Sequence, residues 1–355
     1  DIFKKMLLKK LKIFLRKIYL YSVIILICII FIECLTTIAL KFNTFKNFNY
    51  SFLTFSFTEI TNSNFLNLKK NISLKEDISI FTDINRLRVR EEAFNHNLND
   101  NSNKVIFLGD SVPFGWGVNY EDSIPGAFEK INKKFTVINA AVPSYTIKQS
   151  VDKFIEELKD VKNINYIYIS NFNPLDLYLM FGKKWNESLN WSNYVDYFAH
   201  DIFFYKYKNL PIWGEISLFK VLRKIHVTKF FERPKNIIYE RNSDTDKKFI
   251  MFFINQLERL SKNVDENTVI IFVPIMSPLN FHKNALEDEI NNQRLDLINK
   301  VNNSLKLYNK NNFIYFDTIE KLNSFNEKDL FIDECCHLTP FSALEIAKNL
   351  NKLID

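Results

Sequence analysis

The chain has 355 residues, of which 47% are hydrophobic, so it can bury a full core as one large domain plus an anchor, or as two domains. Its formal net charge is +6, but seven basic side chains and one acid lie within residues 1–17, and basic and acidic residues balance over the remainder. A neutral body argues against nucleic-acid binding, which needs a basic face. The four cysteines give no disulfide framework and no metal-ligand spacing, so we expect neither a metal nor a cofactor.

Residues 18–40 form an apolar run whose one charged residue is Glu33. This length crosses a bilayer, and the basic cluster before it predicts a cytoplasmic N-terminus. We therefore expect an uncleaved signal anchor, a single-pass membrane protein and an extracytoplasmic catalytic domain. A cleaved signal peptide is the alternative, but it favours a shorter apolar core and a clear small-x-small cleavage site. Glu33 is expected at the outer interface, protonated, or paired with another membrane helix.

Residues 41–103 are polar and rich in Asn, which indicates a stalk and a lead-in segment containing a short strand at 78–81. The domain proper is expected over residues 104–355, where strand and helix patterns alternate. This alternation is typical of an α/β fold with three α/β/α layers and a mostly parallel sheet. The expected strands cover residues 105–108, 135–139, 164–170, 268–273 and 312–316, and the expected helices cover residues 124–132, 147–158, 248–260, 287–307 and 343–354.

The apolar strand at residues 105–108 ends at Gly109 and is followed by Asp110 and Ser111. Ligands of open α/β sheets bind at this edge, where a serine hydroxyl reaches the cleft and nearby N–H groups can stabilise an oxyanion. A capped turn would explain the same three residues, so they decide little alone.

A serine nucleophile needs a base, and the base needs an orienting carboxylate. Of the five histidines, only His337 lies in a loop beside carboxylates, Asp333 and Glu334, and ahead of a terminal helix pattern. The sequence therefore predicts Ser111 and His337 as a nucleophile–base pair.

Four sequence blocks, in this order, resemble the SGNH (GDSL-type) hydrolase superfamily. Residues 109–111 match the nucleophile block, 139–146 resemble the second block, 171–174 stand in place of the third, and 333–337 resemble the last. The resemblance runs from about residue 81 to the C-terminus, with a poorly matched middle. It implies an SGNH/flavodoxin-like fold and serine esterase or acyl-transfer chemistry.

The resemblance also implies an oxyanion hole made of the backbone N–H groups of Ser111 and Ser144 and the side-chain amide of Asn173. Several positions depart from the family pattern. Ser144 and Arg86 each stand where the family usually has Gly, and Pro174 replaces an Asp outside the triad. A backbone donor does not require Gly, so acyl transfer survives the change at Ser144.

The triad acid is open between two neighbours. The family spacing D-x-x-H selects Glu334, whereas the residue type and the apolar pair before it select Asp333. We predict Asp333, because a loop accommodates one extra residue.

Residues 183–246 do not match the family core and are rich in aromatic residues. We expect an insertion with its own hydrophobic cluster; a lid or a carbohydrate platform is the alternative. The chain as a whole is expected to be a serine esterase or O-acyltransferase that acts on ester-linked groups, such as acetyl, of cell-envelope glycan or lipid. The alternative, motivated by Ser144 and Pro174, is a catalytically weak envelope protein that binds glycan or partners a membrane acyltransferase.

Overall fold

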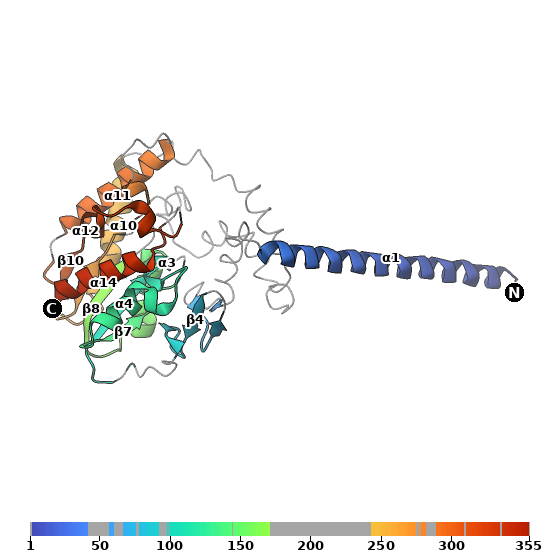
Figure 1. Cartoon of the computed structure of the whole chain (residues 1–355), viewed down its shortest axis with the longest axis horizontal. Coiled ribbons are helices and arrows are strands. Elements are labelled where there is room, and N and C mark those ends of the chain that lie inside the picture. The colour runs from blue at the N-terminus through green and yellow to red at the C-terminus, as the bar shows by residue number, and fades with distance from the viewer. Residues whose placement is uncertain are drawn as a thin grey trace. The chain divides into compact units, whose positions relative to one another are not determined.

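The computed structural model describes residues 2–41, 57–59, 67–75, 78–91, 98, 100–143, 145–170, 243–274, 276, 278–281, 289–308, 310–333 and 336–354. Helix α1 belongs to one unit of the chain, and the described residues from Phe57 onward belong to a second (Figure 1). Each unit is considered by itself. Most of the expected insertion at residues 183–246 lies outside the described residues.

Helix α1 (Ile2–Lys41) contains an apolar stretch, Phe14–Leu35, with a mean hydropathy of 2.7. Within the described part of the chain it is the one helix long and apolar enough to cross a membrane, judged by length and composition. The large apolar side chains described in this stretch are exposed. An anchor and a signal sequence both have these properties.

The main sheet of the second unit has eight strands in the order β10-β9-β8-β6-β7-β5-β4-β3. The five strands from β10 to β7 are parallel, and β5, β4 and β3 extend the sheet with antiparallel pairing. The strands are β3 (Ser73–Lys75), β4 (Ser79–Thr82), β5 (Arg88–Val89), β6 (Lys104–Gly109), β7 (Thr136–Asn139), β8 (Ile164–Ser170), β9 (Val269–Phe272) and β10 (Phe313–Tyr315). Two further strands, β1 (Thr58–Glu59) and β2 (Asn67–Leu68), form a separate antiparallel pair.

Strand β6 marks the point where the direction of sheet growth reverses. The next strand, β7, pairs with one side of β6, and β8 pairs with its other side. In doubly wound sheets the ligand crevice opens at such a switch point, beyond the carboxyl ends of the strands. The residues that follow β6 therefore stand at the expected ligand site.

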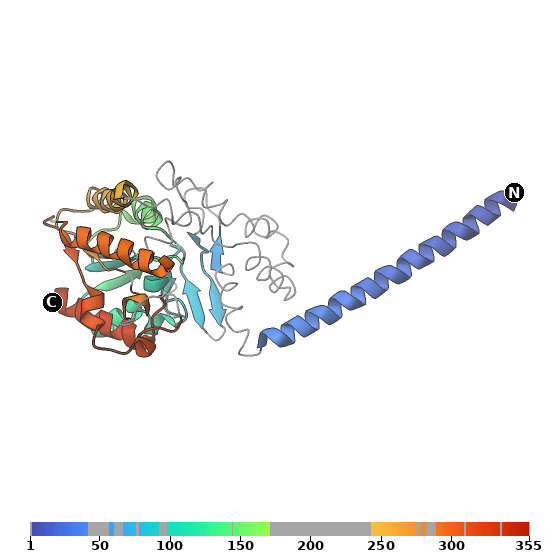
Figure 2. The ribbon, with the colours of Figure 1, turned by 90° about the horizontal axis from the view of Figure 1, so that it is seen from above.

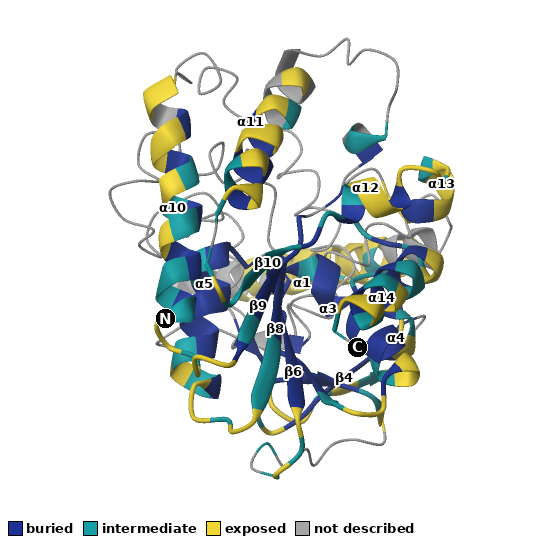
Figure 3. Cartoon of the chain, turned by 90° about the vertical axis from the view of Figure 1, so that its left-hand side faces the viewer, coloured by how far each residue is buried: buried dark blue, intermediate teal, exposed yellow. Residues whose placement is uncertain are grey.

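Helices cover both faces of the sheet (Figures 2 and 3). Alternate residues of β6 contribute to two hydrophobic cores: Ile106 and Leu108 pack with α5, α10 and α11, whereas Val105 and Phe107 pack with α4 and α14. The helices are α3 (Ser111–Phe114), η3 (Tyr120–Asp122), α4 (Ile124–Ile131), α5 (Ile147–Lys153), the π-helical turn η4 (Phe154–Leu158), α10 (Ser243–Ser261), η7 (Pro278–Asn280), α11 (Glu289–Lys306), α12 (Thr318–Leu322), α13 (Glu327–Leu330) and α14 (Pro340–Ile354).

The predicted three-layer α/β fold is confirmed, and the predicted strands and helices are present within a few residues of their expected bounds. Two features differ from the expectation. The lead-in segment before Lys104 supplies β3, β4 and β5 to the main sheet, so the sheet begins before the predicted domain boundary. The single helix expected at 147–158 is an α-helix that continues as the π-helical turn η4.

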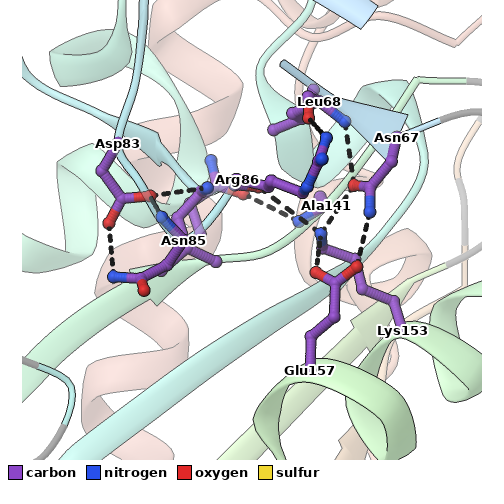
Figure 4. Close-up of polar contacts among 10 residues, drawn as sticks. Asn67, Leu68, Asp83, Asn85, Arg86, Ala141, Lys153 and Glu157 are labelled. Carbon is purple, nitrogen blue, oxygen red and sulfur yellow. Dashed lines mark hydrogen bonds and ion pairs between the residues drawn. The ribbon is translucent and has the colours of Figure 1, made fainter. Parts of the chain in front are cut away.

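A buried polar cluster joins strand β2 to the α5–η4 helix (Figure 4). The ammonium of Lys153, which is fully buried, lies 2.7 Å from Glu157 Oε2 and donates to Asn67 Oδ1 at 2.8 Å. Asn67 in turn donates to Glu157 Oε1 at 2.5 Å. Burial lowers the pKa of Lys153, and Glu157 opposes that shift. The cluster fixes the lead-in segment on the helical layer by charge-assisted hydrogen bonds.

Candidate active site

Gly109 ends β6 and brings the strand very close to β8. Its φ is +145°, and a Cβ built on it would lie 1.8 Å from the carbonyl oxygen of Ser170 and 2.5 Å from Cγ of Pro113. No side chain fits there, so glycine is the residue that lets the chain turn tightly into the next helix.

Ser111 is the first residue of the short helix α3, and Asp110 is its N-cap. The Asp110 carboxylate accepts a hydrogen bond from the N–H of Val112 at 2.9 Å. The Ser111 carbonyl accepts from the N–H groups of Gly115 and Trp116, at 3.1 and 2.9 Å. These bonds hold the serine backbone at the switch point and leave its side chain half-buried at the surface of the site.

His337 lies in a loop closed by two short backbone contacts. Phe331 and Leu338 form an isolated antiparallel bridge, and Ile332 N–H donates to the carbonyl of His337 at 2.9 Å. Within the loop, Asp333 Oδ1 accepts from the backbone N–H groups of Cys336 and His337, at 3.1 and 3.2 Å. The same carboxylate therefore shapes the loop and contacts the imidazole.

The structure brings Ser111, His337 and Asp333 together in a line. His337 Nε2 lies 2.9 Å from Ser111 Oγ, and His337 Nδ1 is hydrogen-bonded to Asp333 Oδ2. With Nδ1–H donated to the carboxylate, Nε2 is left as an acceptor for the serine hydroxyl. This is the geometry in which an imidazole can take the proton of an attacking serine.

Asp333 has the electrostatic properties of an orienting carboxylate. Burial favours its neutral form, but the hydrogen bonds and charge of His337, with the two backbone N–H groups, outweigh burial and hold its pKa below the ordinary value. It therefore stays ionised where His337 needs a negative partner. The alternative acid, Glu334, lies outside the described residues. The four-residue spacing from Asp333 to His337 fits a loop that turns back on itself.

Two of the three predicted oxyanion donors, Ser144 and Asn173, lie outside the described residues, so their role stays a prediction. The third is the backbone N–H of Ser111, at the start of α3. N–H groups in the first turn of a helix have no partner within that helix, which suits them to bind an anion.

Arg88 holds the turn after the nucleophile and was not singled out by the sequence. It is fully buried, and its guanidinium donates to the carbonyls of Phe114, Gly115 (2.7 Å) and Val118 (2.7 Å). Asn139, at the end of β7, donates from its side-chain Nδ2 to the carbonyls of Pro113 and Phe114, at 3.3 and 3.4 Å. Burial lowers the pKa of Arg88 to about 10. The sequence offered one signal for Arg88: it lies in the lead-in segment, which resembles the corresponding segment of the family.

Trp116 was also missed, because an aromatic residue between two glycines has no specific signature. Its ring centroid lies 6.3 Å from that of His337, at an interplanar angle of 45°. Behind it stands Phe57, fully buried, which stacks on Phe114 at 5.3 Å and lies 6.2 Å from Trp116. Phe57 comes from the lead-in segment, so that segment contributes to the surroundings of the triad.

Within the described residues, no group of three or more His, Cys, Asp or Glu side chains is placed to hold a metal ion. Ser111, His337 and Asp333 form a continuous hydrogen-bonded arrangement. It can activate a hydroxyl nucleophile through its own proton-transfer chain.

No protein-family model matches the chain, and no curated protein matches it. Solved structures that it resembles include a lipase from a goat rumen metagenome, with a TM-score of 0.43 and 14% identity over 71% of this chain and 97% of that one. A carbohydrate acetylesterase family member from Sinorhizobium meliloti gives a TM-score of 0.39 and 12% identity, over 71% and 97%. The acetylxylan esterase Axe2 from Geobacillus stearothermophilus gives a TM-score of 0.38 and 11% identity, over 73% of this chain and 96% of that one. Because these identities and TM-scores are low, the similarities do not support a function, and the functional argument depends on the geometry of Ser111, His337 and Asp333.

The strand order and the positions of Ser111, His337 and Asp333 agree with the fold expected from the sequence. The parallel core has the strand order β7-β6-β8-β9-β10. Ser111 follows β6, which is the first of these strands along the chain, and the Asp333–His337 pair precedes the last helix, α14. The sequence resemblance to SGNH (GDSL-type) hydrolases implies this arrangement, and the α/β fold that it implies is present.

Proposed function

We propose that the chain is a serine esterase or O-acyltransferase that acts through an acyl-enzyme on Ser111. The observation that carries the proposal is the continuous hydrogen-bonded line from Ser111 Oγ through the His337 ring to Asp333. A line of this kind converts a weak hydroxyl nucleophile into one that attacks an ester carbonyl.

In the first half-reaction, Ser111 Oγ attacks the carbonyl carbon of the ester while its proton passes to His337 Nε2. The oxyanion that forms is stabilised by the Ser111 N–H and, as the sequence predicts, by the Ser144 N–H and the Asn173 amide. Collapse of this intermediate breaks the bond to the alcohol oxygen, which takes the proton from His337. Asp333 stabilises the imidazolium that exists between these two steps.

In the second half-reaction, an acceptor hydroxyl attacks the acyl-Ser111 ester. His337 removes the proton of the acceptor and returns it to Ser111 Oγ as the acyl group leaves. Water as the acceptor gives hydrolysis, and a sugar hydroxyl gives transfer. The triad chemistry is the same for both outcomes.

The proposed substrates are ester-linked groups, such as acetyl, on glycan or lipid of the cell envelope. Support comes from the apolar stretch of α1 and the basic cluster at residues 1–17, at its N-terminal end, which together favour a cytoplasmic N-terminus and an extracytoplasmic domain. A membrane acyltransferase partner would fit the transferase form of the reaction.

The test uses full-length protein in detergent with p-nitrophenyl acetate as substrate and a fluorophosphonate as covalent label. We expect Ser111→Ala and His337→Ala each to lower kcat by on the order of a thousandfold or more, because each interrupts the proton-transfer line. Ser111→Ala should also abolish labelling. Ser304→Ala, on the outer face of α11, is the matched control and should keep both activities.

The acid is tested by Asp333→Asn and Glu334→Gln in the same assay. We expect the first to lower kcat by on the order of a thousandfold, because Asn favours the wrong imidazole tautomer, and the second to change it only a few-fold. Loss in Glu334→Gln alone would assign the acid to Glu334. Folded wild-type protein with neither turnover nor labelling would contradict the enzyme and favour the catalytically weak envelope protein.

A further inference from the structure

Phe57 is the first residue of the second unit, and its side chain is fully buried although it lies well before residue 104, where the sequence placed the domain boundary. Its ring stacks on that of Phe114, with 5.3 Å between centroids and 8° between planes, and lies 6.2 Å from the ring of Trp116. Both partners belong to residues 111–116, which we call the nucleophile turn. The lead-in segment therefore contacts this turn directly.

The backbone of Phe57 is held by the strand pair β1–β2. Its carbonyl accepts a hydrogen bond from the N–H of Lys69 at 2.8 Å, immediately beside the antiparallel pairing of the two strands. Strand β2 is bound to the helical layer in turn, because Asn67 belongs to the buried polar cluster around Lys153 (Figure 4). The ring of Phe57 is thus a support whose own position is determined by the domain.

The nucleophile turn connects this support to the catalytic pair. Phe114 is the last residue of α3, and Ser111 is the first. The N–H of Trp116 donates to the carbonyl of Ser111 at 2.9 Å, and the Trp116 ring lies 6.3 Å from that of His337. A shift of the turn would therefore change the 2.9 Å distance between Ser111 Oγ and His337 Nε2.

The nucleophile turn keeps its conformation through contacts with distant segments, since a helix of four residues has little stability of its own. Arg88 supports its backbone by donating to the carbonyls of Phe114 and Gly115. Phe57 supports its side chains, because it stacks on the Phe114 ring. One contact is polar and the other apolar, and both come from the lead-in segment.

We propose that Phe57 is a positioning residue for Ser111, and that it acts by holding the Phe114 end of α3. The inference rests on the proposed acyl-transfer function and adds to it a residue from the segment that follows the anchor. Alignment of the reacting groups is a large part of catalysis, and a misplacement of about 1 Å can cost about a hundredfold in rate. The catalytic unit therefore begins at Phe57, ahead of the predicted boundary.

The test uses full-length protein in detergent with the substitution Phe57→Leu, which keeps an apolar side chain but removes the stacked ring. Per folded molecule, with the folded fraction measured by circular dichroism, we expect kcat for p-nitrophenyl acetate to fall about tenfold and KM to stay within about twofold. Fluorophosphonate labelling of Ser111 should slow by the same factor. Phe249→Leu, which removes an equally buried ring from the core beneath α10, is the matched control and should leave kcat and labelling unchanged.

A double-mutant cycle tests the route through Phe114. In a Phe114→Leu background the stacked partner is already missing, so Phe57→Leu should lower kcat by less than about twofold. A tenfold loss in both backgrounds would overturn the inference. So would unchanged kcat and labelling in Phe57→Leu, or an equal loss in Phe249→Leu. Failure of the proposed function would be seen in the wild type itself, as folded protein with neither turnover nor labelling, and this inference would fall with it.

Discussion

Asp110 is a buried carboxyl next to the candidate nucleophile, and its environment resists its ionisation. The side chain is 1% exposed, and burial raises its pKa to about 7 even though the N–H of Val112 donates to it. A carboxyl of this kind keeps its proton in the folded state over a range where the unfolded chain has already released it.

The elevated pKa of Asp110 predicts a pH dependence of stability. Between the ordinary value of 3.8 and about 7, the folded state binds one more proton than the unfolded state at this site, so the free energy of unfolding falls as pH rises. Asp110→Asn keeps an acceptor for the Val112 N–H and removes the titration. We therefore expect the Tm of wild type, relative to Asp110→Asn, to decrease from pH 4 to pH 7. A difference that is constant, or that grows with pH, would contradict the burial argument.

The choice between Asp333 and Glu334 as the triad acid also belongs to the scale of single residues. Asp333 and Glu334 are both close to His337 in the sequence, and family spacing favoured the second. The structure joins Asp333 to the His337 ring and to the loop N–H groups. The short Asp side chain can reach both partners only because the loop turns back at the Phe331–Leu338 bridge.

At the scale of elements, α3 is too short to be stable alone, and Arg88 from β5 holds it in place. Three carbonyls from the end of α3 and the following turn accept from one buried guanidinium. The aromatic face of Phe114 also lies 4.5 Å from its central carbon. Since Ser111 begins this helix, the position of the nucleophile depends on a strand of the lead-in segment.

Arg88 should therefore act as a positioning residue for Ser111. Arg88→Met removes three charge-assisted hydrogen bonds to buried carbonyls and should lower the free energy of unfolding by about 3 kcal/mol or more. Among molecules that remain folded, we expect kcat to fall about a hundredfold with KM little changed, because Ser111 loses its alignment. Arg88→Lys should recover part of both losses. Unchanged kcat in Arg88→Met would show that α3 holds its own conformation.

The buried cluster of Lys153, Glu157 and Asn67 ties a second part of the lead-in segment to the helical layer (Figure 4). Its two ions differ in solvent access: the side chain of Lys153 is 0% exposed, and that of Glu157 is 23% exposed. Removing the partner of a fully buried charge costs more than removing the partner of a hydrated one.

This difference predicts which substitution is worse. Glu157→Gln leaves the Lys153 ammonium without its anion and should cost about 3 kcal/mol of stability, whereas Lys153→Met leaves a carboxylate that water can reach and should cost less. Glu266→Gln, an exposed glutamate outside the cluster, is the control and should change little. Urea unfolding of the four proteins measures the order. A larger loss in Lys153→Met would contradict the account.

At the scale of the whole molecule, charge is concentrated at one end of the chain. Of the seven basic residues of positions 1–17, five precede the Phe14–Leu35 stretch and two, Arg16 and Lys17, lie in its first turn, whereas the remainder of the chain is balanced. Such an asymmetry orients a membrane span with its basic end inside.

We expect a tag at the C-terminus to be removed by protease added to intact cells, and a tag at the N-terminus to be protected. Replacing the seven basic residues by Gln should increase the fraction of chains in which the C-terminal tag is protected, because it removes the orienting charge. A C-terminal tag that is protected in the wild type would contradict the proposed extracytoplasmic site.

The sequence by itself predicted the parallel core and the pairing of Ser111 with His337, and it left the acid open between Asp333 and Glu334. Strands such as β6 and β9 contain continuous apolar runs, helices such as α14 have the 3.6-residue period, and both signals are contained in a few consecutive residues. Gly109, Ser111 and His337 could be found because a strand end and a loop with nearby carboxylates are local patterns. Short strands β3 and β5 gave no comparable signal, since two or three residues show no periodicity.

Only the tertiary structure decided what surrounds the triad. Arg88 stands in the sequence Arg-Leu-Arg-Val-Arg, where charge and spacing do not distinguish the arginine that is buried against α3 from its two neighbours, and only the family resemblance of the segment gave a signal. Trp116 and Phe57 are separated by 59 positions and His337 by a further 221, yet they form one row of rings. Such contacts depend on which distant segments the fold brings together. The local sequence determines whether a segment forms a helix or a strand, whereas tertiary packing determines which distant residues that segment contacts.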